Sequence, residues 1–284
     1  MNKEKSNNII WLASYPKSGN TWLRFLIANY FFNNEKKFNF DVVRKVDKFP
    51  QKDHLTFVKE SEILDNPYNI AKYWIKGQEL LKTIGGNVTF LKTHTPLVTI
   101  DNNSFTNEDS SLAVLHIVRD PRDIAISYSK FLKESYDSII DFMLKKELVY
   151  RIDRKNPLDL EIIGSWKFNY ISWKDGLPLV PKLLIRYEDL LNNTNEEFHK
   201  ILTFLSKILK FDIDKKQLEF AVEASQFNLL SNHEKRHGFE ESSKKGGYFF
   251  REGSKSQWKD ELTKDQVDKI ETNLNFEMKN LKYI

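Results

Sequence analysis

The chain contains no cysteine, only 10 glycines and 8 prolines in 284 residues, and no long apolar run. Without cysteine it can form no disulfide bond, no thiolate nucleophile and no cysteine-ligated metal site. Because no stretch rich in Pro, Gly or Ser divides it, we expect a single domain over residues 1–284 with a large buried core. The apolar run near the N-terminus is too short for a signal peptide or a membrane anchor, which predicts a cytoplasmic protein without a transmembrane segment.

An excess of charge of one sign is also missing. The 44 Lys and Arg residues against 40 Asp and Glu residues leave a formal net charge of +4 at pH 7. A general nucleic-acid surface requires a stronger and clustered basic excess. The composition therefore predicts no nucleic-acid partner and is compatible with a small anionic ligand.

One stretch, Ser14-Tyr15-Pro16-Lys17-Ser18-Gly19-Asn20-Thr21-Trp22, joins an apolar run to a segment with apolar residues on most of its surface. The run 9–13 is typical of a buried parallel strand, and the segment from residue 22 predicts a largely buried helix. A strand, a Gly-containing loop and a helix direct free backbone N–H groups and the positive end of a helix dipole at one point, which favours an anion. In the GxxxxGK[ST] motif the Lys follows the second glycine, whereas here Lys17 precedes Gly19, the only glycine of this stretch. The loop is therefore not that motif. The alternative is a turn that uses Gly19 only for its backbone freedom.

A second short strand, 88–91, leads into Lys92-Thr93-His94-Thr95-Pro96. Open α/β sheets carry their chemistry at the carboxyl ends of strands, and residues two apart on a strand point to the same side. Lys92 and His94 are therefore candidates to act together at one functional site. His116, between apolar neighbours inside a strand, is predicted to be structural.

A third strand, 112–118, opens into Arg119-Asp120-Pro121-Arg122-Asp123 and a helix through Phe131. Asp120 could hold Mg²⁺ in a kinase, or Arg119 could bind a phosphate with the help of Ser127. A third possibility is that Arg119 only pairs with Asp123 at the start of the helix.

The remaining elements are predicted from their apolar spacing. Segments 33–86 and 136–173 are interpreted as excursions that carry the acceptor side, the first with short helices and no strand and the second ending in a helix over 160–173. Strand 182–187 and helices from 194, over 215–224 and at the C-terminus complete the domain. The basic segment 233–247 is either a flexible loop that closes over a ligand or a solvated surface loop.

Several of these segments resemble the sulfotransferases that use 3′-phosphoadenosine 5′-phosphosulfate (PAPS). The stretch around Lys17 resembles their 5′-phosphosulfate loop, with Asn20 where the family usually has Thr. Lys92-Thr93-His94 followed by Pro96 resembles the segment that carries their catalytic His. Arg119 and Ser127 have the spacing of the pair that holds the 3′-phosphate.

Later segments add to the resemblance. Tyr187-Glu188-Asp189-Leu190 resembles a signature whose Tyr lies near the adenine, and Ser225 and Phe227 match an element that contacts the base. Arg251, Gly253 and Trp258 match the element that wraps the 3′-phosphate, while Glu252 stands in place of Lys and should weaken that contact. A dimerisation motif of part of the family is half present, with Lys259 and Thr263 matching, so the oligomeric state stays open.

The resemblance covers core motifs from residue 9 to residue 258 and implies an α/β fold, a P-loop-type three-layer sandwich with a central parallel sheet flanked by helices. It implies PAPS as donor, no metal, and an acceptor hydroxyl on a small molecule, lipid or saccharide. His94 would be the general base, and Lys17 and Lys92 would stabilise developing charge. The implied donor-binding residues are Lys17, Ser18, Gly19, Asn20, Thr21, Trp22, Arg119, Ser127, Tyr187, Ser225, Phe227, Arg251, Glu252 and Gly253. The alternatives are a P-loop kinase that needs Mg²⁺, or a non-catalytic nucleotide-binding protein, in which loss of His94 would be expected.

Overall fold

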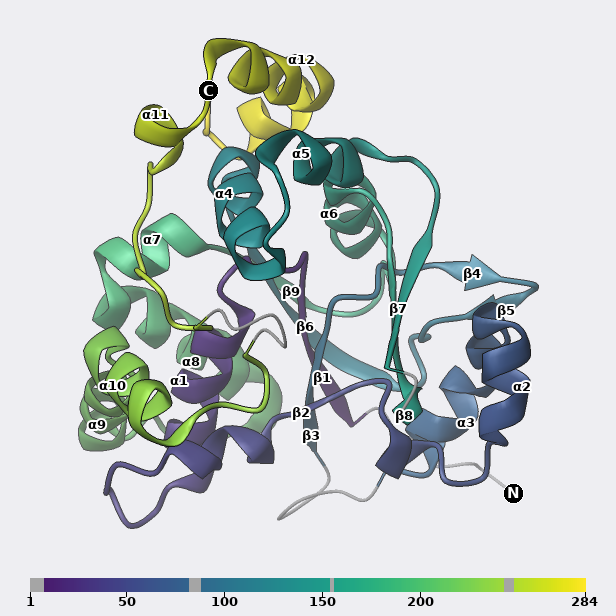
Figure 1. Ribbon diagram of the computed structural model, residues 1–284. Helices are drawn as coiled ribbons and strands as arrows, with labels where there is room; N and C mark the ends of the chain where they lie inside the picture. Colours follow the sequence, from purple (N-terminus) through teal and green to yellow (C-terminus); the bar gives the residue numbers. More distant parts are fainter. Residues whose placement is uncertain (1–7, 82–87, 154–155, 243–247) are drawn as a thin grey trace. The chain divides into compact units, whose positions relative to one another are not determined.

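The computed structural model describes residues 8–81, 88–153, 156–242 and 248–284 (Figure 1). The chain divides into two compact units: the first consists of 1–15, 46–117 and 146–184, the second of 16–45, 118–145 and 185–284. The single domain over 1–284 stays a prediction. Residues 82–86 of the first predicted excursion and 243–247 of the predicted basic loop lie outside the described residues.

A five-stranded sheet runs in the order β2-β3-β1-β6-β9. Its strand β1 pairs in parallel with β3 and β6, and β3 pairs in parallel with β2. Every residue of β1 is buried, as expected for a strand covered on both faces. The bounds are β1 (Ile9–Ser14), β2 (Asp47–Lys48), β3 (Thr89–Thr93), β6 (Ser111–Val118) and β9 (Lys182–Arg186). The α/β class with a central parallel sheet is confirmed, and so are the four predicted strands.

The first excursion does contain a strand, contrary to prediction. β2 is two residues long, too short to show an alternating pattern, and joins the sheet by pairing Asp47 with Leu91 and Lys48 with Lys92. The predicted short helices are present there. In the first unit they are η2 (Lys52–His54), α2 (Glu60–Asp65), η3 (Pro67–Tyr73) and α3 (Trp74–Glu79), and η1 (Phe40–Lys45) belongs to the second unit.

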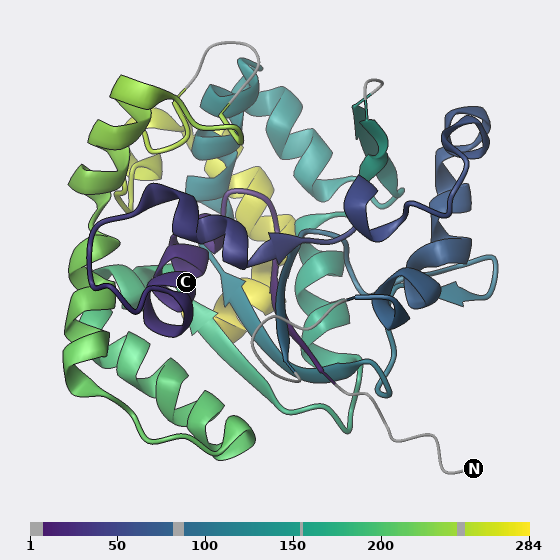
Figure 2. The ribbon, with the colours of Figure 1, turned by 90° about the horizontal axis from the view of Figure 1, so that it is seen from below.

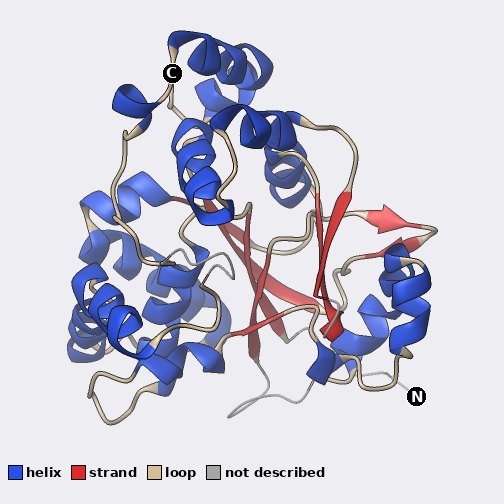
Figure 3. Ribbon diagram, viewed as in Figure 1, coloured by secondary structure: helices blue, strands red, loops and turns tan. Residues whose placement is uncertain are grey.

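Two antiparallel pairs complete the first unit together with α6 (Trp166–Asp175), which packs against β1. These are β4 (Thr99–Ile100) with β5 (Asn103–Ser104), and the hairpin β7 (Val149–Asp153) with β8 (Asn156–Ile163), drawn in red in Figure 3. The prediction of a helix from residue 160 is wrong, because 160–163 belong to β8 and the helix begins after the N-cap Ser165. An aromatic core joins Trp11, Trp74, Phe105 and Trp173.

Among the described residues, the second unit consists mainly of helices. Purple α1 packs against green α9, and α9 also contacts α8 (Figure 2). Phe198, Ile201, Leu202 and Leu205 are buried on one face of α8, as the spacing predicts. The elements are α1 (Asn20–Phe32), η1 (Phe40–Lys45), α4 (Pro121–Leu132), α5 (Tyr136–Leu144), α7 (Tyr187–Asn192), α8 (Thr194–Leu209), α9 (Lys215–Ala224), α10 (Phe227–His237), α11 (Trp258–Glu261) and α12 (Lys264–Asn280). None of the helices in the described part of the chain has the length and apolar character needed to cross a bilayer.

Candidate active site

The phosphate-type loop ends at Gly19, which is the N-cap of α1. Lys17 and Gly19 both have positive φ angles, of 67° and 93°, so the backbone reverses sharply before the helix. As a glycine, the N-cap residue has no side chain with which to cap α1, and the N–H of Leu23 donates to the carbonyl of Gly19 at 3.1 Å. The positive end of the helix dipole at this first turn favours an anion.

The ammonium of Lys17 lies between two aromatic rings. Its Nζ is 4.1 Å from the ring centre of Phe131 and 4.2 Å from that of Phe249. Burial of the ammonium, followed by the charges of Arg119 and Arg251, lowers the pKa of Lys17 to about 7. Three cationic side chains therefore act on one another at this loop, and an anion placed among them would relieve their repulsion.

Arg119 connects the loop to the segment after Gly253. Its guanidinium donates to the carbonyl of Lys17 at 3.2 Å and to that of Ser254 at 2.9 Å, and it lies 4.5 Å from the ring centre of Tyr187. Its Nε is buried and has no hydrogen-bond partner among the residues that the structure describes. The predicted alternative, a pair with Asp123, is not among the ion pairs of the described residues. The guanidinium is instead held by the two backbone carbonyls and by the ring of Tyr187.

Asp123 binds the backbone of the segment that follows Gly253. Its carboxylate accepts hydrogen bonds from the backbone N–H groups of Ser256, at 2.6 Å, and Trp258, at 3.2 Å. These bonds attach the segment that follows Gly253 to the first turn of α4. The same segment supplies the Ser254 carbonyl that receives Arg119.

Trp22, at the start of α1, contacts two residues assigned to the adenine side. Trp22 donates from Nε1 to the carbonyl of Ser225 at 3.0 Å, and its ring lies 6.0 Å from that of Tyr187 in an edge-on arrangement. A Cβ on Gly253 would lie 2.5 Å from Cδ2 of Phe227, so this glycine allows close packing of the two segments. The residues assigned to the adenine side by resemblance are thus brought together within the second unit.

Arg251 and Glu252 form an ion pair with each other, and Arg251 also donates to Gln257 at 3.1 Å. The carboxylate of Glu252 therefore competes with any anion for Arg251. Ser127 is half-buried on α4.

His94 lies in the first unit, directly after β3. Its Nδ1 is 3.0 Å from the carbonyl oxygen of Ser14 and 3.1 Å from the hydroxyl of the same residue. A carbonyl only accepts, so Nδ1 carries the proton and Nε2 keeps its lone pair. Burial, together with the charge of Lys92, lowers the pKa of His94 to about 3. The imidazole is thus neutral near pH 7 and has the tautomer of a base acting through Nε2.

Two side chains of α6 hold this segment, and neither of them was assigned a role in the site from the sequence. Asn169 donates to the carbonyl of His94 and Trp173 donates from Nε1 to that of Thr95, both at 3.0 Å. The sequence signal that could have pointed to this pair is its spacing of four residues, which places both side chains on one face of the helix.

Lys92 is engaged by a residue that the sequence did not reveal. Its Nζ lies 3.1 Å from Oε1 of Glu161 on β8, and Arg151 on β7 contacts the other carboxylate oxygen. The two cations hold the pKa of Glu161 well below its usual range, despite the opposing effect of burial. His116 is buried beside Tyr170, and its structural role stays a prediction.

The kinase alternative placed Mg²⁺ on Asp120. Asp120 instead caps α4 by accepting from the N–H of Arg122 at 2.9 Å and pairs with its guanidinium at 2.6 Å. Within the described ranges, no three His, Asp or Glu side chains are grouped so that they could hold a metal ion. Asp120 therefore acts as the N-cap of α4 and as the partner of Arg122.

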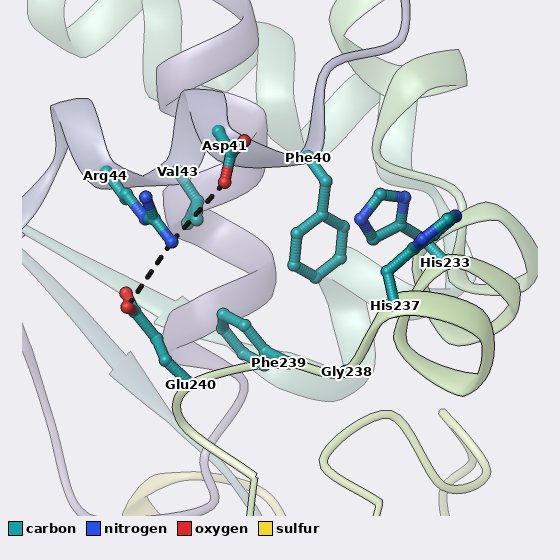
Figure 4. Close-up of a pocket in the computed structure, with 9 residues that line it drawn as sticks. All are labelled: Phe40, Asp41, Val43, Arg44, His233, His237, Gly238, Phe239 and Glu240. Carbon is teal, nitrogen blue, oxygen red and sulfur yellow. Dashed lines mark ion pairs between the residues drawn. The ribbon is translucent and has the colours of Figure 1, made fainter.

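A further pocket of about 410 Å³ lies in the second unit (Figure 4). His233 stacks on Phe40 with ring centres 4.3 Å apart, and Arg44 contacts Asp41 at 3.6 Å and Glu240 at 3.5 Å. None of the predicted site residues lines it. Residues 233–237, predicted to belong to a loop, form the last turns of α10.

Comparison with known proteins identifies the family. The family model described as "Sulfotransferase domain" matches residues 7–282. The amine sulfotransferase of Oryctolagus cuniculus is 23% identical over 97% of this chain and 83% of its own length, and the 3-alpha-hydroxysteroid sulfotransferase of Cavia porcellus is 24% identical over 90% and 78%.

Among solved structures, mouse sulfotransferase SULT7A1 complexed with PAP has a TM-score of 0.56 and 17% identity, covering 96% of this chain and 84% of that one. Retinol dehydratase in complex with androsterone and inactive cofactor PAP has a TM-score of 0.61 and 16% identity, covering 97% and 81%. These structures share the fold, and the family model covers nearly the whole sequence. The chain therefore belongs to the sulfotransferase domain family.

Proposed function

We propose that this chain transfers the sulfuryl group of PAPS to a hydroxyl group of an acceptor. The observation that carries the proposal is the cluster of cations at the loop before α1, where Arg119 donates to the carbonyl of Lys17 and the charges of Arg119 and Arg251 act on the Lys17 ammonium. Such a cluster suits a ligand with several negative charges. The two similar structures named above contain PAP, the desulfated form of this donor.

The residues of the second unit fit the donor. Within the described part of the chain, the buried polar atoms that lack a hydrogen-bond partner include Oγ of Ser18 in the loop and Nε of Arg119. Because buried polar groups are nearly always paired in proteins, these two atoms favour a polar ligand. We assign the 5′-phosphosulfate to Lys17 and the start of α1, the 3′-phosphate to Arg119, Ser127 and Arg251, and the base to Trp22, Tyr187, Ser225 and Phe227.

His94 is proposed to remove the proton of the acceptor hydroxyl. Its hydrogen bond to Ser14 leaves the Nε2 lone pair for that task. A hydroxyl is a weak nucleophile near neutral pH, so a positioned base speeds its attack. Lys92 and Lys17 are proposed to stabilise the negative charge that develops on the oxygen between phosphorus and sulfur.

The acceptor is proposed to carry its hydroxyl on a small molecule, a lipid or a saccharide. We propose that segments 33–86 and 136–173 supply the acceptor side. The names of the two relatives specify an amine and a hydroxysteroid, which differ in chemistry, so they do not select one acceptor class.

Calorimetry with PAP and with ATP plus Mg²⁺ tests the donor assignment. We expect PAP to bind at least about tenfold more tightly than ATP, because Arg119 and Arg251 supply charge for a second phosphate. Tighter binding of ATP with Mg²⁺ would favour the kinase alternative. Incubation with ³⁵S-labelled PAPS and a panel of 2-naphthol, a hydroxysteroid and a monosaccharide then tests for transfer to oxygen, and transfer to amines alone would contradict it.

A further inference from the structure

Two carboxylates of β8 each pair with a lysine of the sheet. Asp159 and Glu161 lie two residues apart on the strand, so their side chains point to the same side. Asp159 lies 3.6 Å from Nζ of Lys48, and Glu161 lies 3.1 Å from Nζ of Lys92. Lys48 and Lys92 are register partners on β2 and β3. Two adjacent ion pairs therefore attach the β7–β8 hairpin to the sheet.

The two pairs differ in their exposure to solvent. The side chains of Lys48 and Asp159 are 40% and 23% exposed, whereas those of Lys92 and Glu161 are 7% and 10% exposed. Water screens the first pair, but a buried ammonium depends strongly on its counter-charge. The position of Lys92 is therefore more sensitive to loss of Glu161 than that of Lys48 is to loss of Asp159.

The buried pair acts on His94, which follows Lys92 by two residues. The charge of Lys92 lowers the pKa of His94, and the charge of Glu161 raises it. Arg151, the register partner of Glu161 in the hairpin, contacts the second oxygen of the same carboxylate. Glu161 thus joins the hairpin to the strand end that carries His94.

We propose that Glu161 is a positioning residue for group transfer, whose carboxylate fixes the ammonium of Lys92 beside His94. The inference rests on the proposed roles of His94 and Lys92 in sulfuryl transfer. Glu161 acts through Lys92, and the hairpin, which the sequence did not predict, supplies part of the catalytic apparatus.

Glu161→Gln tests the proposal, with Asp159→Asn as a matched control on the same strand. Both changes remove one charge and keep the shape of the side chain. We expect Glu161→Gln to lower kcat at least about tenfold on the best acceptor of the panel, with PAP affinity within about twofold of the wild type. Asp159→Asn should leave kcat within about twofold. Wild-type turnover in Glu161→Gln, or an equal loss in Asp159→Asn, would overturn the proposal.

A double-mutant cycle separates positioning of Lys92 from a general effect on the fold. In the Lys92→Met background, Glu161→Gln should change kcat by less than about twofold, because the group through which it acts is already gone. A tenfold loss in both backgrounds would contradict the proposal. If Glu161→Gln does not fold, Lys92→Met is compared with Lys92→Met/Glu161→Met, in which apolar side chains replace the buried pair. Equal turnover supports the proposal, and lower turnover in the double variant opposes it.

Failure of the proposed function has a different signature. In that case the wild type transfers no label to any acceptor, or His94→Ala retains its turnover. The link between Glu161 and Lys92 can still be tested by acetylation with acetic anhydride, read by mass spectrometry. Lys92 should be acetylated faster in Glu161→Gln than in the wild type or in Asp159→Asn, and equal rates would overturn the inference.

Discussion

Lys17 carries its charge in surroundings that oppose it. Two phenyl rings enclose its ammonium, and two guanidinium groups act on it from nearby. The rings attract a cation only weakly compared with the cost of removing it from water. The pKa of about 7 therefore leaves Lys17 partly neutral in the free protein near neutral pH.

Binding of PAP should weaken as the pH rises from 7 to 9. Above a pKa of about 7 the free protein loses the proton of Lys17, whereas bound phosphate favours the ammonium, so binding must take up a proton. Each unit of pH should lower the affinity by up to about tenfold in this range. Calorimetry at several pH values measures the slope. Lys17→Arg, whose guanidinium does not titrate there, should show little slope, and a wild type as flat as this variant would contradict the expectation.

His94 and Lys92 were predicted as site residues from the sequence because they stand at the end of an apolar strand, and in the structure Lys92 lies near the end of β3 and His94 directly after it. Glu161 was not, although Leu158, Leu160 and Ile162 alternate with Asp159 and Glu161 in the pattern of a half-buried strand. The aromatic residues just beyond residue 163 favoured a helix over that alternation. The partner of Lys92 lies 69 residues away in the chain, and no local pattern encodes such a contact.

Elements with a strong periodic signal were predicted well. The apolar run of β6 and the amphipathic pattern of α8 specify their structure locally. β2 was missed because a two-residue strand is defined only by its pairing with β3. The segment 250–258 has no regular structure before α11, and its place depends on hydrogen bonds to Asp123 and Arg119, which are properties of the folded chain.

Gly253→Ala should lower PAP affinity by at least about tenfold, because it disturbs the contact between the segment 250–258 and α10. The new Cβ would lie 2.5 Å from the ring of Phe227, and φ is +60° at this position. Gly238→Ala is the control, since φ is +78° there and no atom of the described residues lies within 4 Å of the added Cβ. Both variants should lose stability, seen as a lower thermal midpoint, but only Gly253→Ala should bind PAP more weakly. Equal affinities of the two variants would show that the contact does not matter for the donor.

For the whole molecule, we expect turnover to survive EDTA. The cations that would neutralise the donor are side chains, Lys17, Arg119 and Arg251, and Asp120 is already paired with Arg122. Initial rates with labelled PAPS before and after chelation should agree within about twofold. Abolition of turnover by EDTA and its rescue by Mg²⁺ would contradict the expectation and return the kinase mechanism to consideration.

Membership in the sulfotransferase domain family follows from a match over residues 7–282. The order of short motifs was visible in the sequence because each motif is local: a loop before a helix, a strand end, or a strand-to-helix turn. The sequence did not predict the acceptor. A pocket for it is formed by side chains from distant segments, and no local sequence pattern encodes such a pocket.

The central claim, that His94 is the general base of a sulfuryl transfer, is tested most directly by the kcat of His94→Ala with labelled PAPS. PAP affinity and the thermal midpoint are measured on the same sample. Loss of a general base should lower kcat by about 10²-fold or more and leave PAP affinity nearly unchanged. If the buried imidazole were only structural, activity would fall no further than the folded fraction. A folded His94→Ala variant with near-normal turnover would contradict the claim.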